Sequence, residues 1–181
     1  MKYSILMPYY KRAEQLQSTL QSFMHFYSGR NDYEVILIED AKSSEEDRHA
    51  LSIVLSEFES HVYMKRIQGP IGDSYSPAST YNIGAKEADG DYLILTNPEA
   101  MHVKDILKGL DEEFAKDDNC YVVCSSLSVS ESILSMELAR HISGKWYQHS
   151  IHRNTGCHFC SAISWEQYFS IAGLDEEYSA G

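Results

Sequence analysis

Residues that could bind a nucleotide or a metal ion follow three short apolar runs of this sequence. They are Pro8, Tyr10 and Arg12 after the run at 3–7, Glu39 and Asp40 at the end of the run at 33–40, and Asn97 and Glu99 after the run at 92–96. A tyrosine ring gives a uracil ring a stacking surface, and a carboxylate accepts strongly from its N–H. A carboxylate also suits a divalent cation, which prefers charged oxygen ligands. These residue types favour a nucleotide site made by an aromatic residue, a carboxylate pair and a further acid.

Strands and helices that alternate along the chain must position these residues. Apolar runs predict strands at 3–7, 33–40, 62–67, 92–96 and 121–126. Between them, apolar residues at helical spacing predict helices at about 12–26, from Ser43 onward, from Ser76 to about Ala88, and at about 103–114. Ser43 lies three residues before Glu46 and therefore predicts a capping box, and Pro77 after Ser76 predicts a helix start.

This order predicts an α/β fold with a mostly parallel sheet and helices on both faces, because strands that are apolar throughout must be covered on both sides. In such sheets ligands bind outside the carboxyl ends of the strands. The candidate residues would therefore face one cleft. At 181 residues, the chain has the length of one ordinary domain.

Composition and motifs argue against several functions. Neither G-x-G-x-x-G nor G-x-x-x-x-G-K-S/T occurs, which disfavours a Rossmann dehydrogenase and a P-loop enzyme. A formal net charge of −12 with scattered Lys and Arg argues against binding to nucleic acid. No apolar run approaches the roughly 20 residues that span a bilayer, and Met1 leads directly into strand-like sequence without a signal-peptide pattern. We therefore expect a cytoplasmic protein without a transmembrane segment.

Four cysteines leave a zinc site and free thiols as alternatives. Cys157 and Cys160 have the spacing of a zinc-ligand pair, with His158 between them. Cys120 and Cys124 lie in or beside an apolar strand, on one face but too far apart to chelate one ion. Since buried free thiols are the commoner case in a reducing compartment, we expect thiols rather than zinc.

Four blocks of the sequence resemble, in the same order, those of family 2 glycosyltransferases with the GT-A fold. The blocks are SILMPYYKRAEQLQSTLQSF, YEVILIEDAKS, NIGAKEADGDYLILTNPEA and SAISWEQYFSIAGLDEEYSAG, which are spread over nearly all of the chain. The resemblance implies one GT-A domain over 1–181, with a nucleotide-binding half at 1–100 and the incomplete start of an acceptor-binding half at 101–181. It also implies transfer of a sugar from a nucleotide diphosphate sugar, with UDP as the expected nucleotide, to the hydroxyl of a saccharide or another acceptor.

The resemblance assigns roles to residues after the first two strands. The segment from Pro8 to Arg12 matches a Pro-x-Tyr-Asn-Arg-like segment of the family, in which Tyr10 would flank the base. Glu39 and Asp40 match a paired acid, and Asp40 would accept from the base or the ribose. The alternative for this pair is a solvated loop with an Asx-type turn.

Further on, the match to the family is mixed. Asn82 matches the Asn of an Asn-x-Gly motif and is a further candidate for nucleotide binding, but the arginine often found just before that position is Tyr81 here. This replacement removes a possible contact to the base or the phosphate.

Asn97-Pro98-Glu99 occupies the position of the family's Asp-x-Asp metal motif. Glu99 would contact Mn²⁺ or Mg²⁺, whereas Asn97 offers a neutral carbonyl oxygen. With one formal charge in place of two, metal binding would be weaker or would depend on the nucleotide. Two alternatives remain: that Asn97 and Pro98 only end a strand, and that the protein works without a metal ion.

The last block resembles the acceptor-side segment of the family. Ser164 lies three residues before Gln167 and would cap its helix, and Trp165 would line the acceptor side or pack in the core. In the family the catalytic base follows this segment, so the resemblance gives no catalytic residue within 1–181 and places the base beyond Gly181. The alternatives are a non-catalytic module that binds nucleotide sugars, and a nucleotidyltransferase of similar topology, which would need a Gly-rich loop after the first strand.

Overall fold

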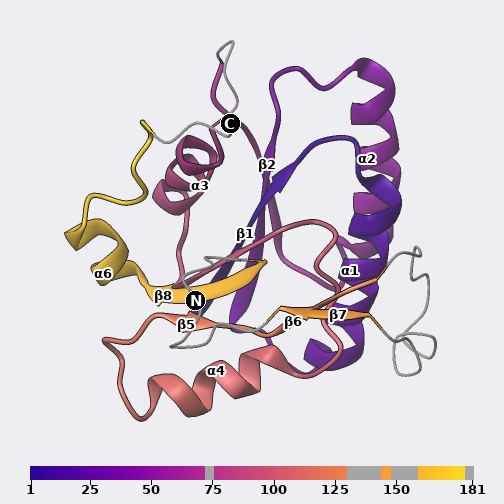
Figure 1. The fold of residues 1–181 in the computed structure, drawn as a ribbon. Helices are drawn as coiled ribbons and strands as arrows, with labels where there is room; N and C mark the ends of the chain where they lie inside the picture. The colour runs from indigo at the N-terminus through magenta and orange to yellow at the C-terminus, as the bar shows by residue number, and fades with distance from the viewer. Residues whose placement is uncertain (72–75, 130–143, 148–158, 178–181) are drawn as a thin grey trace.

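Six strands form the central sheet of the computed structural model (Figure 1), which describes residues 1–71, 76–129, 144–147 and 159–177. Across the sheet the strand order is β3-β2-β1-β4-β8-β5. These strands are β1 (Tyr3–Tyr9), β2 (Tyr33–Glu39), β3 (Met64–Gln68), β4 (Tyr92–Thr96), β5 (Val122–Val123) and β8 (Cys160–Ser164). A separate antiparallel pair consists of β6 (Ser126–Ser128) and β7 (Lys145–Tyr147).

The middle strand β1 sets the register of the parallel part. It pairs with β2 from Tyr3 to Tyr9 and with β4 from Tyr3 only to Leu6. Pro8 therefore lies where β1 has only β2 beside it, so its missing N–H removes no hydrogen bond to β4. This register ends β1 and β2 side by side, with Tyr9 opposite Glu39.

Helices cover both faces of the sheet, as strands that are buried throughout require. The helices are α1 (Ala13–Tyr27), α2 (Glu45–Phe58), α3 (Pro77–Lys86), α4 (Ile106–Phe114) and α6 (Trp165–Ser170). Successive side chains of a strand point to opposite faces. Ile5 and Met7 pack in one cluster with residues of α1, α2 and α4, whereas Leu6 packs in another with residues of α3 and α6. Figure 1 shows α1 and α2 on one side of the sheet and α3 on the other.

The predicted fifth strand at 121–126 is wrong in its extent. Only Val122–Val123 joins the central sheet as β5, and Ser126 begins β6. The sequence analysis also missed β8, which lies between β4 and β5 and runs antiparallel to both. The sheet is therefore parallel from β3 to β4 and antiparallel from β4 to β5.

The helix α2 begins one residue later than predicted. Ser44, rather than Ser43, is its N-cap: Ser44 Oγ accepts from the backbone N–H of Asp47 at 3.2 Å, and the Asp47 carboxylate accepts from the Ser44 N–H at 3.1 Å. Ser43 is buried in the preceding loop, and Ser44 has the extended backbone that an N-cap needs. The predicted caps Ser76 and Ser164 are confirmed.

None of the helices in the described part of the chain combines the length and the apolar character needed to cross a bilayer.

Candidate functional site

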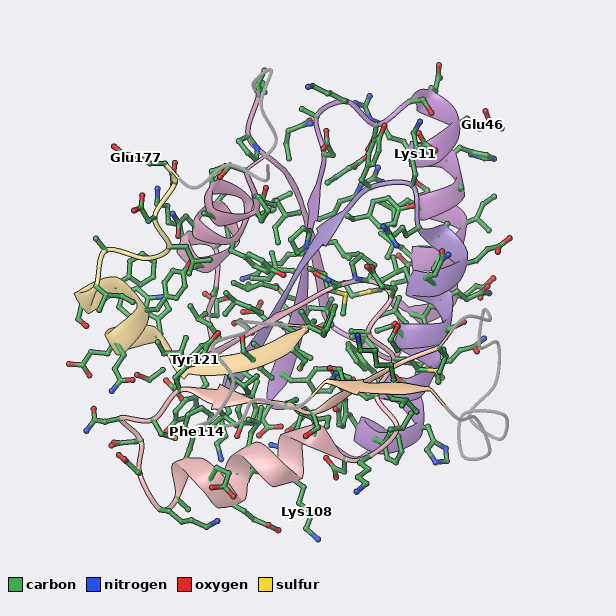
Figure 2. The ribbon with its side chains drawn as sticks, in the orientation of Figure 1. Lys11, Glu46, Lys108, Phe114, Tyr121 and Glu177 are labelled. Carbon is green, nitrogen blue, oxygen red and sulfur yellow. The ribbon has the colours of Figure 1, made fainter. Side chains whose placement is uncertain are left out.

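The predicted site residues gather at the carboxyl ends of β1, β2 and β4. Figure 2 shows Lys11, which follows β1, at this end of the sheet near Glu46 of α2, while Phe114 and Tyr121 lie toward the opposite end. The backbone N–H of Asp40 donates to the carbonyl of Tyr9 at 2.9 Å, which ties the end of β2 to the end of β1.

Asp40 is held in an Asx turn directly after β2. Its Oδ1 accepts from the backbone N–H of Lys42 at 2.7 Å, and its carbonyl accepts from the N–H of Ser43 at 3.0 Å. The Asx turn named as the alternative is thus present. It fixes the carboxylate at the strand end and uses only part of its capacity, since a carboxylate has about four acceptor positions. Asp40 can therefore cap its own loop and still accept from a ligand.

Glu39 is occupied by two arginines. The Arg66 guanidinium contacts Glu39 Oε2 from Nε at 2.8 Å and from Nη2 at 2.7 Å, and Arg48 Nε lies 3.3 Å from Oε1. The carboxylate is almost fully buried, whereas both guanidinium groups are partly exposed. In this arrangement Glu39 holds two cations at the end of β2. Neither arginine carries a local signal in the sequence.

Two buried hydroxyls at this end of the sheet have no hydrogen-bond partner among the described residues. They are Tyr9 Oη and Ser43 Oγ. Burial raises the pKa of Tyr9, so its hydroxyl keeps its proton and can donate. Buried polar groups usually find a partner in the protein, in ordered water or in a ligand. These hydroxyls can therefore still bond to a ligand or a water molecule at the ends of β1 and β2.

Tyr10 has an exposed ring where the chain turns from β1 into α1. Its side chain is 44% exposed, and Lys11 Nζ lies 5.1 Å from the ring centroid. Lys11 has a φ of 51°, in the left-handed region that few residues other than glycine adopt. This conformation redirects the chain and leaves an aromatic surface near Asp40.

The turn Asn97-Pro98-Glu99 is fixed by contacts from two helices. Thr19 of α1 donates to the carbonyl of Pro98 at 2.6 Å. Tyr81 of α3 donates to the carbonyl of Thr96 at 3.0 Å and lies 3.3 Å from Asn97 Oδ1. A hydroxyl has one proton, so it cannot donate fully to both oxygens. When the Tyr81 hydroxyl donates to the Thr96 carbonyl, a 180° rotation of the Asn97 amide lets the Asn97 NH₂ donate to the Tyr81 oxygen. Asn97 Oδ1 is then free to contact a ligand.

Arg12 forms an ion pair with Glu99. Arg12 Nη1 lies 3.3 Å from Glu99 Oε1, and the two side chains are 50% and 37% exposed. Arg12 is the N-cap residue of α1 but makes no side-chain cap bond. Arg12, a predicted nucleotide-binding residue, and Glu99, the predicted metal ligand, therefore contact each other across the ends of β1 and β4.

The residues at this turn fit a divalent cation only in part. Glu99 supplies one charged donor group, and Asn97 can add a neutral oxygen. Within the described ranges there is no group of three or more His, Cys, Asp or Glu side chains that could hold a metal ion. Mg²⁺ and similar ions can be held by one or two carboxylates together with phosphate oxygens. The donor set thus fits a cation that a diphosphate helps to bind.

Asn82 anchors the segment that follows α6. Its Nδ2 donates to the Leu174 carbonyl at 2.9 Å and to Glu176 at 2.8 Å, and its Oδ1 accepts from the Leu174 N–H at 2.9 Å and from Tyr168 Oη at 2.6 Å. These bonds use all four positions of a primary amide. Gly173, with a φ of 78°, passes so close that a Cβ would lie 2.5 Å from Asn82 Oδ1. Asn82, which was predicted to contact the nucleotide, thus binds other parts of the protein.

Cys120, Cys124 and Cys160 are free, and Cys160 is the buried one of these three. Cys157 and His158 of the alternative zinc site lie outside the described residues, so the choice of thiols over zinc stays a prediction. The N–H of Cys124 donates to the Cys160 carbonyl at 2.9 Å, which places the two residues side by side on β8 and the end of β5. A hydrogen bond to Cys124 and complete burial raise the pKa of the Cys160 thiol well above its usual value.

A hollow lies at the opposite end of the sheet from these residues. It has a volume of about 730 Å³ and lies between the start of β4 and α6, where its lining includes Asp91, Asp118, Glu166 and Trp165. Trp165 is 41% exposed, so the alternative that it packs in the core is wrong. Trp165 is far along the sheet from the Asn97–Glu99 turn, because β4 joins the two regions end to end.

Comparisons with known proteins agree with this architecture. A family model described as glycosyl transferase family 2 matches residues 4–166. A search of curated protein sequences gives no match. Among solved structures, the crystal structure of S. aureus TarS 1–349 is 14% identical, covers 100% of this chain and 52% of that chain, and has a TM-score of 0.76.

Two similar structures contain nucleotide sugars. S. aureus TarS 1–349 in complex with UDP-GlcNAc is 14% identical, with coverage of 94% of this chain and 47% of that chain and a TM-score of 0.70. The mannosyltransferase PcManGT from Pyrobaculum calidifontis, in complex with GDP-Man and Mn²⁺, is 13% identical, with coverage of 97% and 48% and a TM-score of 0.68. These similarities confirm the predicted fold class. The chain spans about half the length of these structures.

Proposed function

The chain belongs to glycosyl transferase family 2, and from this premise we propose that it binds a nucleotide diphosphate sugar and takes part in sugar transfer to an acceptor hydroxyl. UDP is the proposed nucleotide. The observation that carries the proposal is that an exposed tyrosine, a carboxylate with free acceptor positions and an arginine–glutamate pair lie at the carboxyl ends of three neighbouring strands. The neighbours' complexes with UDP-GlcNAc and GDP-Man support the ligand class.

The nucleoside would bind between β1 and β2. Tyr10 offers a stacking surface, and Asp40 accepts from the base N–H or a ribose hydroxyl. Arg48 and Arg66, which Glu39 holds at the end of β2, keep this region from becoming strongly negative. Pro8 holds the backbone that leads to Tyr10.

The diphosphate would bind between Arg12, the amino end of α1 and the Asn97–Glu99 turn. A guanidinium donates two parallel hydrogen bonds to phosphate, and the amino end of a helix carries a partial positive charge. A divalent cation, Mn²⁺ or Mg²⁺, would be held by Glu99 and Asn97, and when bound it stabilises negative charge on the departing diphosphate. Arg12 supplies positive charge at the same position.

The proposed reaction breaks the bond between the anomeric carbon and the diphosphate oxygen. The acceptor oxygen forms the new bond to that carbon, and the nucleoside diphosphate leaves with the bonding electrons. A base takes the acceptor proton. The described acids nearest the acceptor-side segment have other contacts: Glu176 accepts from Asn82, and Asp175 accepts from the backbone of Glu177. We therefore assign no base among the described residues.

The two halves of the proposed domain meet at Asn82. Residues 1–100 would bind the nucleotide, and 101–181 would begin the acceptor side. The four hydrogen bonds of Asn82 form the junction between these halves. They join α3 of the first half to α6 and to the segment after α6 in the second half. Asn82 would then act on the nucleotide indirectly, by fixing the position of the segment around Leu174 and Glu176.

Calorimetric titration with UDP, GDP and UMP tests the proposal, since a specific site should prefer one nucleoside and the diphosphate. A transfer assay with a nucleotide diphosphate sugar and a saccharide acceptor tests the transfer step. Nucleotide binding without turnover would favour a non-catalytic module. The absence of binding by any nucleoside diphosphate would refute the proposed function.

A further inference from the structure

We propose that Arg12 masks Glu99 from metal ions until a diphosphate draws the guanidinium away. The inference rests on the proposed function, because it takes Glu99 as the metal ligand and a nucleotide diphosphate as the ligand of Arg12. It adds an order to binding: the nucleotide-free protein binds divalent cations poorly, and the nucleotide prepares the metal site.

The geometry of the pair supports masking. Arg12 Nη1 lies 3.3 Å from Glu99 Oε1, within reach of the only charged donor that the turn provides. A cation bound to this oxygen would lie next to the guanidinium. The two positive charges would repel each other, and Oε1 would have to give up its contact with Arg12.

The pair is also built so that Arg12 is the side that moves. The backbone of the Glu99 turn is fixed by the bond from Thr19 to the Pro98 carbonyl and by the bond from the Ala100 N–H to the Asn97 carbonyl. Arg12 has a long side chain that is 50% exposed, and it makes no cap bond to α1. It can therefore leave Glu99 without disturbing the helix.

A diphosphate is the ligand that would move Arg12. The present contact is a single one at the surface, and such pairs contribute little free energy. A phosphate offers two parallel acceptors to the planar guanidinium, which is a stronger arrangement. Once Arg12 binds phosphate, Glu99 is released and diphosphate oxygens lie nearby, so both changes favour the cation. Because such coupling is reciprocal, the cation must raise the affinity for the diphosphate by the same factor.

The test is a Mn²⁺ titration of the nucleotide-free chain, followed by the electron paramagnetic resonance signal of free Mn²⁺. Arg12→Gln should bind Mn²⁺ about fivefold more tightly than the parent, since an exposed ion pair hides up to that factor. Arg12→Gln combined with Glu99→Gln should lose this gain. The increase in Mn²⁺ affinity caused by UDP should be smaller in Arg12→Gln than in the parent.

Lys11→Gln is the matched control, because it removes the same charge from the neighbouring residue. Lys11 Nζ lies 3.9 Å from Asp47 and over the Tyr10 ring, and it should leave Mn²⁺ affinity unchanged. Circular dichroism checks that each variant is folded. Equal Mn²⁺ affinities for the parent and Arg12→Gln would overturn the masking, as would an equal gain in Lys11→Gln. Titration with UDP in the presence of Mn²⁺ separates the two proposals. A failure of UDP to bind under these conditions refutes the nucleotide site, whereas UDP binding together with equal Mn²⁺ affinities of the parent and Arg12→Gln refutes only the masking.

Discussion

At the amino ends of the strands, charged groups are paired with one another, whereas at the carboxyl ends several polar groups are half-exposed or lack a partner. Glu34, fully buried at the start of β2, accepts from Ser4 and from the Asp89 N–H and forms an ion pair with Lys65 at 2.9 Å. At the other end, Arg12 and Glu99 make one exposed contact, and Tyr9 and Ser43 have buried hydroxyls without a described partner.

This difference separates stability from binding within one sheet. Charges that the protein satisfies internally stabilise the folded state and leave nothing for a ligand. Polar groups that it leaves unsatisfied reduce stability and retain the capacity to bind. Variants at the amino end should therefore change unfolding, and variants at the carboxyl end should change nucleotide affinity.

The largest expected effect is at the amino end. Lys65→Met leaves the carboxylate of Glu34 buried without its counter-charge, which typically costs about 3–5 kcal/mol of folding free energy. Urea unfolding measures the loss, and the affinity for UDP of the folded variant should not change. Lys116→Met is the control, because Lys116 pairs with Glu113 at the surface, where an ion pair contributes little, and its loss should change stability far less than that of Lys65. A loss below about 1 kcal/mol for Lys65→Met would contradict the contrast.

The pH dependence of stability sharpens the same contrast. His102 is buried with its Nδ1 against Tyr27 Oη, and burial lowers its pKa from 6.5 to about 4. Between about pH 4 and pH 6.5, His102 is therefore protonated in the unfolded chain and neutral in the folded chain. Stability should be full above about pH 6.5 and should fall by about 3 kcal/mol as the pH drops to about 4.

The measurement for His102 is urea unfolding at several pH values, with His102→Asn as the comparison. Asparagine has no titrating group, so other acid-sensitive residues such as Asp111 act alike in both proteins. The difference between the two pH profiles isolates His102. Parallel profiles would show that His102 binds its proton equally in the folded and unfolded states.

At the carboxyl end, the expected change is in affinity. Asp40→Ala should weaken UDP binding by about 1.5–3 kcal/mol, the usual range for a hydrogen bond to a charged group. Asp91→Ala is the matched control, because Asp91 lines the hollow at the start of β4. Isothermal titration calorimetry measures both. If folded Asp40→Ala binds UDP as the parent does, Asp40 does not contact the nucleotide.

The smallest expected effect distinguishes two adjacent serines. Ser44→Ala removes the N-cap of α2 and should cost about 1 kcal/mol of stability. Ser43→Ala removes a buried hydroxyl without a described partner, and should cost less than about 0.5 kcal/mol. Thermal unfolding of the two variants gives the comparison. A larger loss for Ser43→Ala would mean that its hydroxyl is satisfied, for example by a buried water.

Local pattern was enough to predict most of the sheet and its helices. The runs that became β1, β2 and β4 are apolar throughout, and the stripe of α1 repeats at three and four residues, so each was readable alone. β8 was not, because a strand of five residues gains its identity from β4 and β5 on either side. The capping box was misplaced by one residue because Ser43 and Ser44 each precede an acid by three.

The site was predictable in position but not in its pairings. The rule that ligands bind at the carboxyl ends of strands placed Asp40 and Glu99 at one end. The partners Arg66 for Glu39 and Arg12 for Glu99 depend on strand register and on helix placement, which no local pattern encodes. Asn82 shows the same limit, since its four partners come from a segment about 90 residues later in the chain.

The position of β8 has a consequence for synthesis on the ribosome. Residues 122–123 emerge before residues 160–164, yet β5 joins the sheet only through β8. Until β8 arrives, the nascent chain has an open edge on β4 and an unpaired β5, and open edges invite pairing with other chains. Among the described strands of the sheet, β8 is the last to be translated, so a chain stalled before β8 should need a chaperone more than one that includes it.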